Sequence, residues 1–138
     1  MTSVILDTGP LVALLNRRER HHAWAREILD TIEPPVFTCD PVLSEACFLL
    51  QNTGGGSDAV LELMSRGIVR SDFRVSAELD SLRALMKKFA SVPMSLADAC
   101  LVRMTELDRE SAVLTLDGDF TIYRRNRRQT VPIISPDQ

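Results

Sequence analysis

Val4-Ile5-Leu6-Asp7-Thr8-Gly9-Pro10, close to the start of the chain, sets a pattern that recurs along the sequence. Its apolar residues suit a short buried strand, and they meet Asp7 directly. The chain then turns at Thr8-Gly9-Pro10, where Pro10 suits the first position of a helix because that position leaves its backbone N–H unpaired. The stretch therefore predicts a strand followed by a helix, with a carboxylate between them.

Strands and helices alternate along the rest of the chain. Short apolar runs predict strands at residues 3–6, 36–38, 68–70, 112–115 and 131–134. Apolar residues at helical spacing predict intervening helices that include residues 25–32, 42–50, 60–64, 79–89 and 97–104, with Asp40 and Asp58 expected as helix caps. Strands joined through helices favour a parallel sheet covered on both faces. We therefore predict an α/β fold, a three-layer α/β/α sandwich with a central, mostly parallel sheet.

Composition is typical of a globular protein. The 138 residues are 45% hydrophobic and 25% charged, which predicts one domain over residues 1–138. Cys39, Cys47 and Cys100 lack metal-binding spacing and lie in apolar stretches, so we expect reduced core residues and a cytoplasmic protein. The first apolar run meets Asp7 too early for a secretory signal or a membrane span.

Three more carboxylates lie in surroundings like those of Asp7. Glu45 and Asp98 fall in the first turns of predicted helices, and Asp117 follows a predicted strand. Alone, each has a simpler explanation as a helix cap, a dipole partner or a turn residue. Together they could converge, because ligand sites in parallel sheets form beyond the carboxyl ends of the strands. Since unpaired buried carboxylates are costly, a shared metal site is the better explanation.

The segments that carry these carboxylates are Leu6–Leu15, Ser44–Ala46, Ser95–Cys100 and Thr115–Phe120. In this order, and over essentially the whole chain, they resemble the motifs of PIN-domain ribonucleases, specifically VapC-type toxins. The resemblance implies an acidic quartet with a possible fifth member and three supporting hydroxyl residues: Asp7, Glu45, Asp98, Asp117, then Asp119, and Thr8, Ser95 and Thr115. Gly118 departs from the pattern, because relatives often carry a basic or larger polar residue there.

The chemistry of the quartet supports the same class of enzyme. Carboxylate oxygens without His or Cys partners suit Mg²⁺ or Mn²⁺, as one or two ions. Such ions activate water and stabilise a phosphodiester under attack. We expect Asp7, Asp98 and Asp117 to hold metal and Glu45 to bind a second ion or orient the water. The predicted function is a metal-dependent endoribonuclease, the toxin of a toxin-antitoxin pair; the alternative is an inactive PIN-like RNA- or protein-binding module.

The charge distribution supports more than one interpretation of the binding partners. The net charge of −3 argues against nucleic-acid binding, but Arg17, Arg18 and Arg20 form one basic cluster and residues 124–128 form another. Solvated turns are the simpler explanation of both clusters. The resemblance implies an RNA substrate, with tRNA or another structured RNA as candidates, a cognate antitoxin, a homodimer and no membrane. We expect residues 124–128 to contact phosphate or antitoxin, and the helices near Trp24 or Leu49 to form the dimer contact.

Other acid-based enzyme classes fit the sequence poorly. A receiver domain needs a late lysine, but the only lysines are Lys87 and Lys88. A haloacid-dehalogenase phosphatase needs Asp-x-Asp after its first strand, whereas position 9 is glycine. His21 and His22 are expected at a helix start beside Trp24, without a catalytic role.

Overall fold

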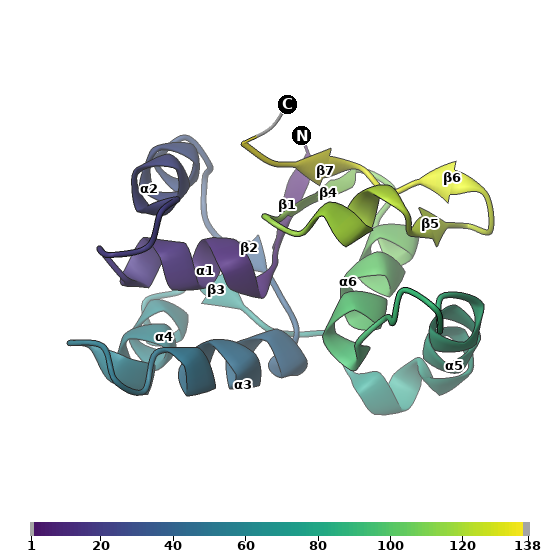
Figure 1. The fold of residues 1–138 in the computed structure, drawn as a ribbon, viewed down its shortest axis with the longest axis horizontal. Helices are drawn as coiled ribbons and strands as arrows, with labels where there is room; N and C mark the ends of the chain where they lie inside the picture. The colour runs from purple at the N-terminus through teal and green to yellow at the C-terminus, as the bar shows by residue number, and fades with distance from the viewer. Residues whose placement is uncertain (1, 137–138) are drawn as a thin grey trace.

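A central sheet of parallel strands organises the protein in a computed structural model, which describes residues 2–136 (Figure 1). The strand order is β3-β2-β1-β4-β7, and every pairing is parallel. β1 lies at the centre and pairs with β4 from Ser3 opposite Ser111 to Leu6 opposite Leu114. The strands are β1 (Ser3–Leu6), β2 (Val36–Phe37), β3 (Val69–Arg70), β4 (Ser111–Leu114) and β7 (Ile133–Ile134).

Helices pack on this sheet and connect most of its strands. They are α1 (Thr8–Leu15), α2 (His22–Asp30), α3 (Asp40–Leu49), α4 (Gly56–Ser65), α5 (Leu79–Lys88) and α6 (Leu96–Leu107), with the 3-10 helices η1 (Val75–Ala77) and η2 (Gly118–Thr121). Figure 1 shows α1 and α3 to the left of the sheet and α5 and α6 to its right. The predicted three-layer α/β/α fold is confirmed.

The core lies where the central strands meet these helices. Leu6 and Leu114 are completely buried at the ends of β1 and β4, and α6 packs on both strands. Cys39 and Cys100 are buried core residues with free thiols, as predicted, while Cys47, also a free thiol, is half-buried. No helix within residues 2–136 is long and apolar enough to cross a membrane.

Two predicted helix caps are wrong. Asp40 is the first residue of α3, with Cys39 as its N-cap, and its carboxylate accepts a hydrogen bond from the Ser71 hydroxyl at 2.6 Å. Asp58 lies in the first turn of α4, whose N-cap is Gly55. Both carboxylates still lie near the positive end of a helix dipole, which explains why the sequence suggests caps at these positions.

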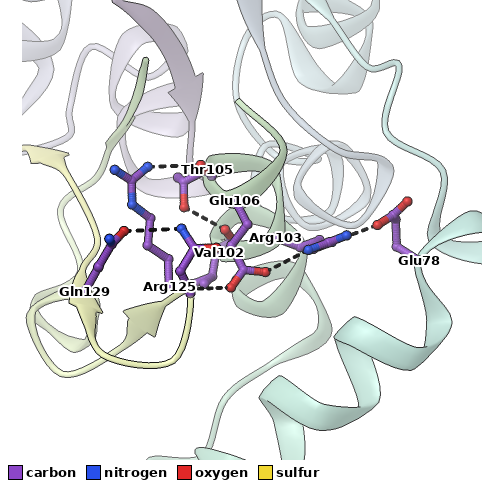
Figure 2. Close-up of polar contacts among 8 residues, drawn as sticks. Glu78, Val102, Arg103, Thr105, Glu106, Arg125 and Gln129 are labelled. Atoms are coloured by element: carbon purple, nitrogen blue, oxygen red, sulfur yellow. Dashed lines mark hydrogen bonds and ion pairs between the residues drawn. The ribbon is translucent and has the colours of Figure 1, made fainter. Parts of the chain in front are cut away.

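A two-stranded antiparallel hairpin, β5 (Arg124–Arg125) with β6 (Gln129–Thr130), occupies the predicted basic cluster. Its turn places Asn126 and Arg127 at φ 49° and 74°, in the left-handed region. Figure 2 shows that Arg125 reaches the main chain of α6 and that Glu106 contacts the same hairpin. The hairpin is therefore fastened to the helix that carries Asp98.

Candidate active site

All five predicted carboxylates line one cleft of about 520 Å³ beyond the carboxyl ends of β1 and β4. Asp7, Glu45, Asp98, Asp117 and Asp119 are joined there by Glu19, which the sequence analysis missed. Across residues 2–136, no Lys, Arg or His side chain lines this cleft. The cleft is thus a concentrated negative site with no built-in neutralising charge.

Asp7 is the most deeply placed of these carboxylates. It follows β1 directly, caps α1 and is only 7% exposed. One oxygen, Oδ1, accepts the Thr8 N–H at 2.7 Å, and Oδ2 accepts the Thr115 hydroxyl at 2.7 Å. Burial, with smaller contributions from the charges of Asp98 and Asp117, raises the pKa of Asp7 to about 6 against the opposing effect of these hydrogen bonds.

Asp98 is held from two directions. It lies in the first turn of α6, where the Ser95 hydroxyl caps the helix by accepting the Asp98 N–H at 3.0 Å. Its Oδ2 accepts a hydrogen bond from the Tyr123 hydroxyl at 2.7 Å. Burial raises the pKa of Asp98, and the charge of Asp117 adds to this effect. The carboxylate therefore has a fixed orientation but no cationic partner.

Tyr123 is a positioning residue that the sequence analysis missed. Its side chain is completely buried, and the rings of Phe89 and Phe120 pack edge-on against it at 5.3 and 5.2 Å between centroids. Burial and the neighbouring Asp98 raise the pKa of Tyr123, so the phenol remains a hydrogen-bond donor. A lone tyrosine in an arginine-rich stretch gives no sequence signal for this role.

Thr115 connects the central strands to the loop that carries the last two acids. Besides donating to Asp7, its hydroxyl oxygen accepts the Asp117 N–H at 2.9 Å. Asp117 Oδ1 in turn accepts the Asp119 N–H at 2.9 Å and caps η2. Gly118 has open space around its Cα, so a larger side chain would fit at this position.

The two glutamates lie at the rim. Glu45, in the second turn of α3, is exposed, and its Oε2 accepts a long hydrogen bond of 3.4 Å from the Thr8 hydroxyl. Glu19 is exposed in the loop after α1. Its sequence context, a polar break between helices, predicts only a loop. Both side chains are freer to move than Asp7 and Asp98 are.

The carboxylates share the cleft without forming a closed cage. Within residues 2–136, no three Asp, Glu, His or Cys side chains are close enough to hold one ion as they stand. Asp98 Oδ1 and Asp117 Oδ2 accept no hydrogen bond from the described residues, so an acceptor on each remains open. Hard oxygen donors with open acceptors fit Mg²⁺ or Mn²⁺.

In EDTA, the protein is expected to become more stable as the pH falls from 7 to 5. The folded-state pKa of Asp7, about 6, lies above its ordinary value of 3.8. The folded chain therefore binds a proton that the unfolded chain lacks between these values, and stability is lost as the pH rises through 6. The whole shift corresponds to about 3 kcal/mol, of which about 1.3 kcal/mol falls between pH 7 and pH 5. Urea unfolding at pH 5, 6 and 7 measures this difference in unfolding free energy. Asp7→Asn should make the unfolding free energy depend less on pH. A wild type that is less stable at pH 5 than at pH 7 would contradict the prediction.

Comparisons with known proteins identify the family to which this chain belongs. Residues 4–126 match the family model of the PIN domain. The chain is 26% identical to Ribonuclease VapC26 of Mycobacterium tuberculosis over 116 residues, which are 83% of this chain and 86% of that protein. The crystal structure of VapC20 from the same species, a sarcin-ricin loop cleaving toxin, superposes with a TM-score of 0.77 at 21% identity, covering 87% of this chain and 94% of that one. The resemblance to VapC-type proteins is confirmed, and the chain belongs to the PIN domain family.

Proposed function

We propose that this protein is a metal-dependent endoribonuclease, built as a single PIN-like domain and acting as the toxin of a toxin-antitoxin pair. The observation that carries the proposal is the cleft in which six carboxylates gather without a cation, with the pKa of both Asp7 and Asp98 raised. Perturbed carboxylates in a cleft are typical of functional sites. The PIN domain and the ribonuclease relative favour RNA as the substrate.

Asp7, Asp98 and Asp117 are the proposed metal ligands. Among the residues that the structure describes, Asp98 and Asp117 each present one carboxylate oxygen without a protein donor, and each oxygen of Asp7 accepts one hydrogen bond. Asp119 lies in the same cleft and is the candidate for an additional ligand. One or two Mg²⁺ or Mn²⁺ ions, when bound, supply the positive charge that activates water and stabilises a phosphodiester under in-line attack.

The protein's own contribution is orientation. Thr8 and Thr115 fix both oxygens of Asp7, while Ser95 and Tyr123 fix the backbone and the carboxylate of Asp98. These contacts place negative charge where phosphate must approach, so a bound divalent ion that neutralises this charge strengthens RNA binding at the cleft. Glu45, exposed and weakly hydrogen-bonded, is free to orient the attacking water at the rim.

The proposed partners follow from the VapC-type relatives. RNA is the substrate, with tRNA or another structured RNA as candidates, and a small cognate antitoxin is the partner in the cytoplasm. A homodimer is also proposed, with its contact near Trp24, which packs partly buried against the core, or near Leu49, which is 51% exposed. Light scattering of the purified protein tests the dimer, and copurification with the product of an adjacent gene tests the antitoxin.

Cleavage of RNA by the purified protein tests the enzymatic proposal. Total RNA and single-stranded oligonucleotides should be cut in the presence of Mg²⁺ or Mn²⁺ and remain intact in EDTA, because the carboxylate cleft has no cation of its own. Sequencing the new RNA ends identifies the sites. RNA that binds tightly but stays intact with every divalent ion would instead support an inactive PIN-like binding module.

A further inference from the structure

A second hollow lies beside the carboxylate cleft and has the opposite charge. It has a volume of about 630 Å³ and is formed by the loop after α1 and the glycine-rich loop after α3. Its lining contains two arginines, two asparagine side chains and no carboxylate: Leu15, Asn16, Arg17, Arg18, Asn52, Thr53, Gly54 and Gly55. We call this hollow the arginine groove.

The arginine groove continues the carboxylate cleft along the same pair of helices. α1 begins at Thr8 in the cleft and ends at Leu15 in the groove, and α3 packs beside it (Figure 1). Arg18 in the groove is followed directly by Glu19 in the cleft. α1, whose eight residues span about 12 Å, runs from one hollow to the other. A polymer with regularly spaced charges can therefore occupy both at once.

The groups in the groove are free to bind an anion. Arg17 and Arg18 are exposed, and neither guanidinium is ion-paired within residues 2–136. In the same part of the chain, the backbone N–H groups of Gly54 and Gly55 donate no main-chain hydrogen bond. Open space around Gly54 leaves its backbone accessible. Guanidinium groups and free amides together are the donors that phosphate oxygens select.

The other basic hollow is less suited to this role. It measures about 200 Å³ and contains Glu106 together with Lys88, Arg124 and Arg127. The Lys88 ammonium already donates to the Arg127 carbonyl, and Arg124 donates to three carbonyls of residues 121–123. Its cations are therefore partly satisfied and offset by a carboxylate, whereas those of the arginine groove are not.

We propose that the arginine groove binds backbone phosphates of the RNA strand that enters the carboxylate cleft. This inference rests on the proposed nuclease function and assigns Arg17 and Arg18 to substrate binding, away from the bond that is cut. Phosphate contacts at this distance strengthen binding without base selectivity, so they hold the strand in register over the acidic centre. They also offset the repulsion between RNA and the carboxylates.

Binding of a fluorescein-labelled 20-nucleotide single-stranded RNA, measured by anisotropy in EDTA, tests the inference without cleavage. Arg17→Ala with Arg18→Ala should raise Kd at least about tenfold at low salt and lower the slope of log Kd against log salt by about 1.4. Arg109→Ala is the matched control, because Arg109 is exposed just before β4, at the opposite edge of the sheet. Its Kd should equal that of the wild type.

Kinetics with Mn²⁺ separates this inference from the proposed function. On the 20-nucleotide RNA, the double variant should have a raised KM and an unchanged kcat. A dinucleotide, which cannot reach the groove, should be cleaved by the double variant as fast as by the wild type. If the double variant cleaves RNA with the Kd and KM of the wild type, the arginine groove does not bind RNA. An acidic protein segment would then be the better candidate for its ligand. Groove-dependent binding by a wild type that cuts no RNA would overturn only the nuclease function.

Discussion

Asp98→Asn is expected to abolish RNA cleavage while leaving the fold unchanged. Asparagine is nearly isosteric, and its carbonyl oxygen can still accept the Tyr123 hydroxyl that now donates to Asp98 Oδ2 at 2.7 Å. The Ser95 cap involves the main-chain N–H of residue 98, so it also persists. The negative charge is lost, and with it a ligand for a divalent ion. We expect kcat/KM to fall by about 10²- to 10⁴-fold, or about 3 to 5 kcal/mol.

Single-turnover cleavage with Mn²⁺ and Mn²⁺ titration by calorimetry measure this effect together. Asp58→Asn is the matched control, since Asp58 is also in the first turn of a helix but is exposed on α4, outside the cleft. It should cleave as the wild type does. Equal activity of Asp98→Asn and Asp58→Asn would show that the carboxylate cleft is not the catalytic site.

Local sequence patterns predict where Asp7 and Asp98 lie because the helix caps at these two positions are formed by near neighbours. Asp7 follows an apolar strand and caps the next helix through the adjacent Thr8 N–H. Asp98 lies three residues after its capping Ser95. These interactions span at most three residues, so a strand signal followed by a helix signal is enough to place them. Parallel topology then brings them to one edge of the sheet.

The parts that sequence patterns miss depend on contacts between distant segments. Tyr123 reaches Asp98 across 25 residues, and its burial depends on Phe89 and Phe120. One miss is local instead: Pro10, expected at the first position of its helix, is the third residue of α1 because Asp7 caps that helix. The β5–β6 hairpin shows no apolar alternation, since its strands are formed by Arg, Gln and Thr. Its stability comes from α6.

The structure divides the basic cluster of residues 124–128 into two kinds of arginine. Arg124 donates to three nearby main-chain carbonyls, and Arg125 donates to the Thr105 carbonyl at 2.9 Å. Arg127 and Arg128 are exposed. We therefore expect charge reversal at Arg124 and Arg125 to perturb folding, so variants of the exposed pair are the better test of a contact with phosphate or antitoxin.

Arg125→Glu is expected to destabilise the protein strongly. Arg125 Nη1 supplies a donor to a carbonyl in the last turn of α6, where helix carbonyls lack main-chain partners (Figure 2). The adjoining Asn126 N–H donates to Glu106 at 2.7 Å, and Arg103 pairs with Glu106 and Glu78. A carboxylate at position 125 would face the Thr105 carbonyl oxygen close to Glu106. Neither that new carboxylate nor the carbonyl would then have the Arg125 donor.

The expected cost is about 2–4 kcal/mol of unfolding free energy, because one buried acceptor loses its donor and a negative charge is desolvated. This lowers Tm by on the order of 10 °C for a chain of this size. Arg128→Glu makes the same charge change at an exposed position and should stay within about 0.5 kcal/mol. Urea unfolding of both variants and the wild type measures the difference. Equal stability of the two variants would mean that the hairpin does not need the Arg125 contact to stay docked on α6, and residues 124–125 would then be as available to a ligand as Arg128.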